Sequence, residues 1–223
     1  MNRILRREKL SFGVIGAAVA AVAICVWMSF GGSQSASAEI VAGGLNQTQA
    51  SNTDGYAARF GTRTLREGMT GPDVRVLKGI VRSKSLLVGS PVSRDFDRPT
   101  TSAVKRFQKK RSLKANGVVS RDTAKTLVRS LRRSGASWYG PGFYGNRTAC
   151  GQTLRPGTVG VAHKKLPCGS KVLIGYRGRY LMTTVIDRGP YVGGRSWDLT
   201  NGARKALKFD GVGDVRNAVV KKR

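Results

Sequence analysis

The stretch of sequence that decides the fold is TTVIDRGPYVGGR, which spans residues 183–195. In an extended strand the side chains alternate between two faces, so Thr183, Val185 and Asp187 share one face and Arg188 points to the other. A Gly-Pro pair follows directly and ends the strand, and its glycine leaves room for a bulky ligand beside the backbone. The pattern predicts a strand that carries Asp187 to the mouth of a β-domain.

An aspartate in this position is a candidate general acid, because an apolar setting favours the protonated carboxyl that such a role requires. The same residues also fit a plainer role, in which Asp187 and Arg188 form a pair that stabilises a turn. His163 is the single histidine of the chain and is open to two interpretations in the same way. It binds or orients a ligand, or it is a buried hydrogen-bonding residue.

The region around this strand has the texture of a small β-protein. Glycines alternate with short β-branched runs at 172–174, 180–186 and 217–220, and one short helix is expected around 203–207. About 85 residues of this kind predict a small closed barrel.

The region before the barrel is predicted to be helical. Gly71, Pro72 and Asp73 open a first helix, with proline in the first turn and an acid near the positive end of the helix dipole. A second helix is expected after 98–100, and Ser120 caps a third. Residues 39–62 are rich in small polar residues without apolar periodicity and are predicted to be a flexible linker.

The first 38 residues predict export. A basic segment precedes an apolar run at 12–30, and the small residues at 36–38 fit a signal peptidase site after Ala38. The apolar run is also close to the length that spans a bilayer, so an uncleaved N-terminal membrane anchor is the alternative. Either way, the protein is expected to be secreted or to lie at the bacterial cell wall, with no other attachment to the membrane.

The net charge predicts polyanionic partners. The chain carries 40 Lys and Arg against 12 Asp and Glu, for a net charge of +28. Removal of residues 1–38 takes away four cations and one acid and leaves +25. For an exported protein the available polyanions are anionic cell-wall polymers, and nucleic acid is not expected as a partner.

The cysteines agree with an oxidising compartment. After export Cys150 and Cys168 remain, and two cysteines outside the cell most often form a disulfide. A catalytic Cys–His pair or a zinc site that includes His163 is the alternative, although the paired C-x-x-C spacing of structural zinc is missing. No metal or cofactor is expected.

Several fixed spacings in the helical region resemble the helical peptidoglycan-binding domain of wall hydrolases. They are Leu65-Arg66-Glu67-Gly68, Gly71-Pro72-Asp73-Val74, Ala103-Val104 with Phe107-Gln108, Leu113, Gly117-Val118-Val119, and Thr123 with Leu127. The chain departs from the family at Asn116-Gly117, where Asp-Gly is usual, and in the more polar stretch 82–97. Without the resemblance, the region is a helical module with a basic face at Lys105, Arg106, Lys109, Lys110, Arg111 and Lys114.

The C-terminal region resembles the double-psi β-barrel of the rare lipoprotein A family, which is related in fold to expansins. The resemblance lies in the following residues, in order: Ala136-Ser137-Trp138-Tyr139-Gly140, Phe143-Tyr144-Gly145, Thr148-Ala149-Cys150-Gly151, Ala162-His163, Leu166-Pro167, Asp187 to Arg195, and Asp198-Leu199. Together the two resemblances imply an α+β protein of two domains, a three-helix peptidoglycan-binding bundle at 63–133 and a six-stranded double-psi β-barrel at 136–223.

The barrel resemblance implies a groove for glycan strands. Some members are lytic transglycosylases, which cut the MurNAc–GlcNAc bond and leave a 1,6-anhydro end. The resemblance implies Asp187 as acid/base with His163 assisting, and Asp198 is the remaining candidate carboxylate, for which a fold-stabilising role is equally open. Candidate substrate-binding residues are Tyr139, Tyr144, Gln152, Arg188 and Tyr191, although the aromatic ones also fit a core.

Two positions depart from the active members of the family. Gln152 and Arg155 stand where these members carry acids, eleven and eight positions before His163. A glycoside hydrolase needs two carboxylates, whereas a transglycosylase can use one, because the C6 hydroxyl of the sugar attacks. The departures argue against hydrolysis and raise the alternative of a non-catalytic peptidoglycan-binding or expansin-like wall-loosening protein.

Overall fold

The computed structural model describes residues 57–220 of the chain. The predicted signal peptide and most of the predicted linker lie outside the described residues. No helix among the described residues is long and apolar enough to cross a membrane.

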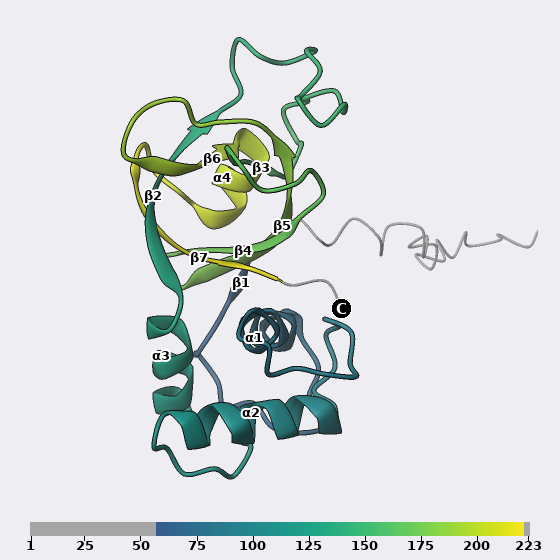
Figure 1. Cartoon of the computed structure of the whole chain (residues 1–223), viewed down its shortest axis with the longest axis vertical. Coiled ribbons are helices and arrows are strands. Elements are labelled where there is room, and N and C mark those ends of the chain that lie inside the picture. The colour runs from purple at the N-terminus through teal and green to yellow at the C-terminus, as the bar shows by residue number, and fades with distance from the viewer. Residues whose placement is uncertain (1–56, 221–223) are drawn as a thin grey trace, which may run out of the picture. The chain divides into compact units, whose positions relative to one another are not determined.

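The helical part contains three helices, as predicted. They are α1 (Pro72–Ser83), α2 (Arg98–Lys110) and α3 (Arg121–Arg129) (Figure 1). Pro72 opens α1, and the Ser120 hydroxyl accepts a hydrogen bond from the Thr123 amide at the start of α3. The cap of α2 is Asp97, whose carboxylate accepts from the Thr100 amide at 3.0 Å. Local capping residues therefore fix where each helix begins.

A buried lysine organises the polar stretch between α1 and α2. Lys78 on α1 is completely buried, and its ammonium donates to the Asp95 carbonyl at 2.7 Å, the Ser93 hydroxyl at 2.9 Å and the Asp97 carboxylate at 3.0 Å. A buried ammonium is stable only with such partners. The polarity of residues 82–97 thus has a structural cause, since this stretch satisfies Lys78 and supplies the cap of α2.

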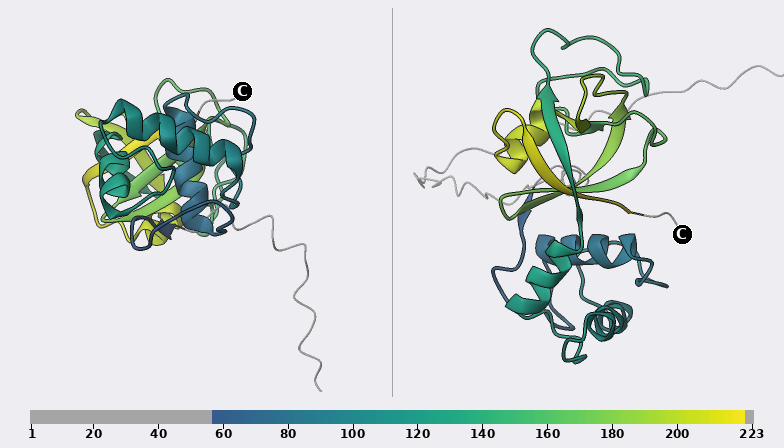
Figure 2. Two further views of the ribbon diagram at one scale, coloured as in Figure 1. Left: turned by 90° about the horizontal axis from the view of Figure 1, so that it is seen from below. Right: turned by 60° about the vertical axis from the view of Figure 1, so that its left-hand side comes forward.

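Six strands form the barrel. They are β2 (Arg132–Tyr139), β3 (Val161–Ala162), β4 (Lys171–Tyr176), β5 (Arg179–Asp187), β6 (Arg195–Thr200) and β7 (Gly213–Val219). Their order is β5-β3-β6-β2-β7-β4, and pairing of β4 with β5 closes the ring. The strands curve around a common interior (Figure 2). The β2–β6 and β3–β5 pairs are parallel and the other pairs of the ring are antiparallel.

Two details of the fold differ from the sequence prediction. The described residues contain four helices. Besides the three helices of the bundle, a fourth, α4 (Asn201–Leu207), stands between β6 and β7 in the chain. The sheet has a seventh strand, β1 (Ala58–Arg59), which pairs with the start of β5 in the segment that the sequence predicted to be linker. In addition, β2 begins at Arg132, so the barrel begins before the predicted boundary at residue 136.

The helical part and the barrel share a hydrophobic cluster. Alternation along β5 explains this, because Leu181 and Val185 point into the barrel core whereas Tyr180 and Met182 point outward. The outward residues join Leu173 and the apolar face of α1 in one cluster. Helix α1 lies against β4, β5 and β7 (Figure 1). The two parts are therefore packed together rather than joined only by a tether.

The closest packing between the two parts involves a glycine. A Cβ atom at Gly79 of α1 would lie 2.8 Å from the sulfur of Met182, which is itself buried. We therefore expect Gly79→Leu to lower the free energy of unfolding by about 1–3 kcal/mol through overpacking. Urea unfolding of the mature chain measures the change.

The double variant tests whether the contact is the cause. Met182→Ala opens space for the new leucine, so Gly79→Leu with Met182→Ala should be more stable than the sum of the two single effects by about 1 kcal/mol. Strictly additive effects would contradict the packing of α1 on the barrel.

Candidate functional site

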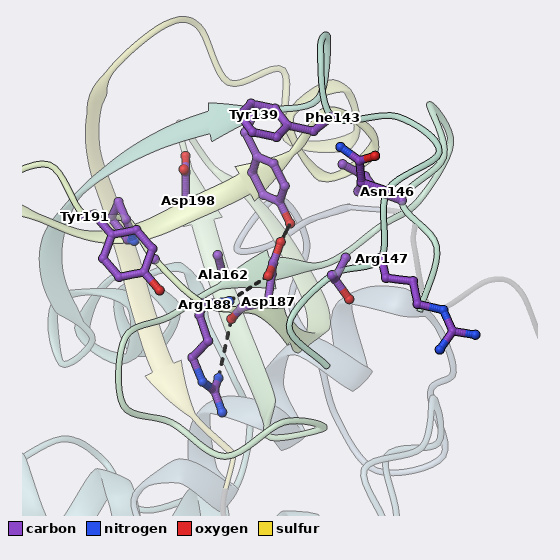
Figure 3. A pocket seen from close by; sticks show the side chains of 13 residues that line it. Tyr139, Phe143, Asn146, Arg147, Ala162, Asp187, Arg188, Tyr191 and Asp198 are labelled. Atoms are coloured by element: carbon purple, nitrogen blue, oxygen red, sulfur yellow. Dashed lines mark hydrogen bonds between the residues drawn. The ribbon is translucent and has the colours of Figure 1, made fainter. Parts of the chain in front are cut away.

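Three neighbouring strands bring two carboxylates into one pocket. Strand β3 runs between β5 and β6, and Ala162 on β3 is the register partner of both Asp187 on β5 and Asp198 on β6. Adjacent strands lie about 4.8 Å apart, so the two aspartate Cα atoms are separated by about 10 Å. All three residues line the same pocket, and Figure 3 shows Ala162 between the two acids. The small side chain of Ala162 leaves the space between them open.

The Asp187 carboxylate is held by three hydrogen-bond donors. It accepts from the Tyr139 hydroxyl at 3.0 Å, the Ala149 amide at 2.8 Å and the Arg188 amide at 2.8 Å. Donors of this kind stabilise the ionised form of a carboxylate. The Asp187 carboxylate therefore meets polar donors, where the sequence pattern suggested apolar neighbours.

Asp198 lies in the opposite kind of environment. Its side chain accepts one hydrogen bond from within the described part of the chain, from the Ser137 hydroxyl at 2.9 Å. Burial raises the pKa of Asp198, and the nearby charge of Asp187 raises it further, against the opposing effects of Ser137 and Arg195. Burial therefore favours the protonated form of Asp198, and its pKa lies above that of an exposed aspartate.

Tyr139 links the two acids electrostatically. Burial raises the pKa of the Tyr139 phenol, and the charges of Asp187 and Asp198 add to the shift. The phenol therefore stays protonated and remains a donor to Asp187. Tyr139 and Ser137 share one face of β2, so a single strand presents a hydroxyl to each carboxylate.

Exposed aromatic rings stand on either side of the carboxylates (Figure 3). Tyr191 follows the Gly-Pro pair and is 82% exposed, and Phe143 is 56% exposed on the opposite side. Phe143 contacts Tyr139 edge to face, with ring centroids 6.2 Å apart. Exposed rings at the rim of a polar pocket suit stacking on sugar rings. The sequence interpretation included Tyr139 and Tyr191 but missed Phe143.

His163 does not line the pocket. Its Nδ1 accepts from the Lys165 amide at 3.1 Å and the Leu166 amide at 3.0 Å, and its ring lies 4.6 Å from that of Trp197. Burial, and then the charge of Arg188, lower the pKa of His163. The imidazole is therefore neutral, and with both amides on Nδ1 its proton lies on Nε2. In this position it fixes the loop that follows β3.

Arg188 holds the same loop. Its guanidinium donates to the Leu166 carbonyl at 3.0 Å and to the backbone carbonyls of His163 and Asp187 at 3.4 Å, and no bond joins it to the Asp187 carboxylate among the described residues. Part of the Arg188 side chain also lines the pocket. The predicted pairing of His163 with the acids is thus an indirect one, through the backbone of residues 163–166.

Two further predicted binding residues lie outside the pocket lining. Tyr144 places its hydroxyl against Gly140, where a Cβ atom would lie 2.7 Å away. Gln152 is exposed, and its carbonyl accepts from the Thr148 amide at 2.8 Å in a turn. The lining on this side comes instead from Asn146, Arg147 and Thr148. Binding roles for Tyr144 and Gln152 stay predictions.

The disulfide between Cys150 and Cys168 is confirmed, with an S–S distance of 2.01 Å. This bond removes both thiols from a catalytic Cys–His pair or a zinc site, so that alternative is wrong. Within residues 57–220 no group of three or more His, Cys, Asp or Glu side chains is placed to hold a metal. The bridge ties Cys150, next to Ala149, to the segment whose Gly169 amide donates to the Val185 carbonyl of β5 at 2.8 Å.

The fold and the pocket define a class, that of a double-psi β-barrel with an acidic groove and a helical domain packed beside it. Two family models agree with this class. Residues 132–219 match the model described as lytic transglycolase, and residues 70–127 match the model described as a peptidoglycan binding domain. The chain thus combines a region similar to the rare lipoprotein A-like double-psi β-barrel with a region similar to a helical peptidoglycan-binding domain.

Individual proteins match over part of the chain. A protein of Synechocystis sp. named probable endolytic peptidoglycan transglycosylase RlpA is 40% identical over 44% of this chain and 32% of its own length. The endolytic peptidoglycan transglycosylase RlpA of Campylobacter jejuni is 39% identical over 38% of this chain and 32% of its own length. The chain therefore spans about a third of the length of these curated relatives.

A solved structure of the apo expansin of Clavibacter michiganensis also matches. It is 19% identical over 41% of this chain and 50% of that chain, with a TM-score of 0.34. A similarity this weak supports no conclusion about function.

The disulfide should restrict the motion of the loop whose Ala149 amide donates to the Asp187 carboxylate. It closes a loop with a sequence separation of 18 residues, so we expect Cys150→Ser with Cys168→Ser to lower the free energy of unfolding by about 3 kcal/mol. The loop that carries Ala149 should also exchange its amide hydrogens faster, which hydrogen exchange with mass spectrometry measures. Unchanged exchange at 146–154 would contradict the role of the bridge in holding this loop.

Proposed function

We propose that this is an exported cell-wall protein that binds peptidoglycan and cleaves its glycan strands as a lytic transglycosylase. The observation that carries the proposal is the pair of carboxylates on either side of Ala162, which share one aromatic-walled pocket but differ in environment. One is arranged to give a proton and the other to accept one. The target is the MurNAc–GlcNAc bond, and the product carries a 1,6-anhydro end.

The chemistry divides between the two acids. Protonated Asp198 donates its proton to the glycosidic oxygen while the bond from that oxygen to C1 of MurNAc breaks. The C6 hydroxyl of the same sugar attacks C1, forms the anhydro bond and gives its proton to the Asp187 carboxylate. One proton enters and one leaves, so the reaction consumes no water, and proton exchange with solvent restores both acids. This division revises the sequence-based assignment of Asp187 as the proton donor.

The neighbouring residues position these groups. Tyr139 and the Ala149 amide orient the Asp187 carboxylate, and Ser137 orients Asp198. Tyr191 and Phe143 are placed to stack on the sugars on either side of the scissile bond. His163 and Arg188 act as positioning residues, since they hold the loop that follows β3.

The comparisons support the substrate class and the location. The relatives of the barrel are named endolytic peptidoglycan transglycosylases, and the helical region matches a peptidoglycan-binding family. Both point to an extracytoplasmic location at the cell wall. The absence of acids at Gln152 and Arg155 favoured the non-catalytic alternative. The second carboxylate in the pocket, Asp198, weakens that argument.

Replacement of either acid tests the mechanism. Asp198→Asn and Asp187→Asn each keep the size of the side chain but remove proton transfer, so each should reduce release of anhydro-muropeptides from purified sacculi by about 10²–10⁴-fold. Binding to sacculi should stay nearly unchanged. Mass spectrometry of the soluble products measures the release.

The matched control is Asp210→Asn, which alters an exposed acid of the barrel away from the pocket. Wild-type protein that binds sacculi but releases nothing would decide for the non-catalytic or expansin-like alternative. Products with reducing ends in place of anhydro ends would show that the enzyme hydrolyses the bond and is not a transglycosylase, since a pair of carboxylates can also activate water.

The pH dependence reports the proton donor. Because Asp198 must be protonated, activity should fall as the pH rises through its pKa, and its raised pKa places this fall above the ~3.9 of an exposed aspartate. The hydrogen bond from Ser137 opposes the shift. Ser137→Ala should therefore move the alkaline limb of kcat/KM to higher pH. A limb that stays in place or moves to lower pH in this variant would remove Asp198 from the role of donor.

A further inference from the structure

The outer surface of the second half of α2 is strongly basic. Six exposed cations lie on its second half and on the turn that follows, and together they form the basic α2 face: Lys105, Arg106, Lys109, Lys110, Arg111 and Lys114. The sequence between Arg98 and Arg121 contains no acidic residue. Within residues 57–220, none of the ion pairs includes a member of this face.

This arrangement has an energetic cost in the isolated protein. Lys105 and Lys109 are four residues apart on the helix, as are Arg106 and Lys110, and like charges at this spacing repel. The negative end of the helix dipole favours Lys109 and Lys110 but falls off within the last turn, so it offers little to Lys105. An anion bound along the face would relieve the repulsion in both rows.

The rest of the helical part offers less surface. Nine of the twelve residues of α1 are buried, and this helix packs against β4, β5 and β7 of the barrel. A wall polymer therefore cannot reach α1 in the folded protein. The basic α2 face, in contrast, is exposed along the second half of its helix.

The chemistry of the face favours carboxylates. Arg106 donates to the Leu86 carbonyl at 2.6 Å, and the Arg111 guanidinium lies 5.9 Å from the centre of the Phe107 ring. Both guanidinium groups are thus engaged by the protein, and the lysines supply the free charge. Lysine ammonium groups act as point charges and lack the fixed fork with which guanidinium binds two oxygens of a carboxylate or a phosphate. Such charges suit single carboxylates carried on flexible arms.

We infer that the basic α2 face binds the carboxylates of peptidoglycan stem peptides. The helical domain would then attach to the peptides of the wall by charge, while the pocket of the barrel takes the glycan. This inference rests on the proposed peptidoglycan partner and adds the chemical group and the residues that bind it.

The test compares two variants of the full mature chain with equal loss of charge. Lys105, Lys109 and Lys110 are changed to Gln in the first, and Lys125, Lys171 and Lys205, exposed cations outside the face, are changed to Gln in the second. Glutamine has nearly the helix propensity of lysine, so equal urea midpoints serve as the check of folding. Binding is measured in the cold by sedimentation with purified sacculi freed of phosphate polymers by acid.

At low salt we expect the α2 variant to bind roughly tenfold more weakly than the wild type and the control variant less than twofold more weakly. The difference should vanish at high salt, because exposed charges are screened. It should also vanish on sacculi whose carboxylates have been converted to neutral amides, which keep their peptides but lose the charge.

Two results would overturn the inference alone. The α2 variant would bind as well as the control variant, or the difference between them would persist on the amidated sacculi. Wild-type protein that fails to bind any sacculi would instead contradict the proposed peptidoglycan partner itself, and the inference with it. Because sedimentation measures binding alone, the result does not depend on whether the barrel cleaves glycan.

Discussion

The pocket depends on the hydrogen bonding of a two-residue strand. Strand β3 pairs with β5 on one side and β6 on the other. Its residue Ala162 is the register partner of both Asp187 and Asp198, so the two acids lie at the same level of the sheet with β3 between them. A slip of one residue in either pairing would turn one carboxylate away from the pocket, because side chains alternate along a strand. Parallel pairing with β5 and antiparallel pairing with β6 bring together acids that are eleven positions apart in the chain.

Two identical side chains meet different surroundings in the pocket. Asp187 is the last residue of β5, and its carboxylate accepts from two backbone amides and a phenol. Asp198 lies deeper in the sheet, where the backbone groups are engaged in strand pairing and a single hydroxyl reaches it. The difference arises from distance to the strand end, and the first carboxylate then strengthens the effect by raising the pKa of the second.

Local sequence patterns predicted the helices and strands. They did not predict features that depend on contacts between residues far apart in the chain. Ser120 and Pro72 predicted the starts of their helices, and β-branched runs predicted β4 and β5, because these signals act within a few residues. The double-psi barrel and Asp198 came from the family resemblance, whereas the strand pattern already singled out Asp187. What escaped prediction depends on partners far along the chain: the amide of Ala149 on Asp187, the exposure of Phe143, and the distance of His163 from the pocket.

The packing of α1 on the barrel also depends on contacts between distant residues, so the sequence did not predict it. This packing bears on how the basic α2 face can act. Outward residues of β5 such as Met182 look like ordinary strand residues until α1 covers them. Once Gly79 lets the helix approach, the helical part is fixed to the barrel by a shared apolar cluster. A basic surface on a fixed module holds the pocket in one orientation to the wall, whereas the same charges on a tether would only raise its local concentration.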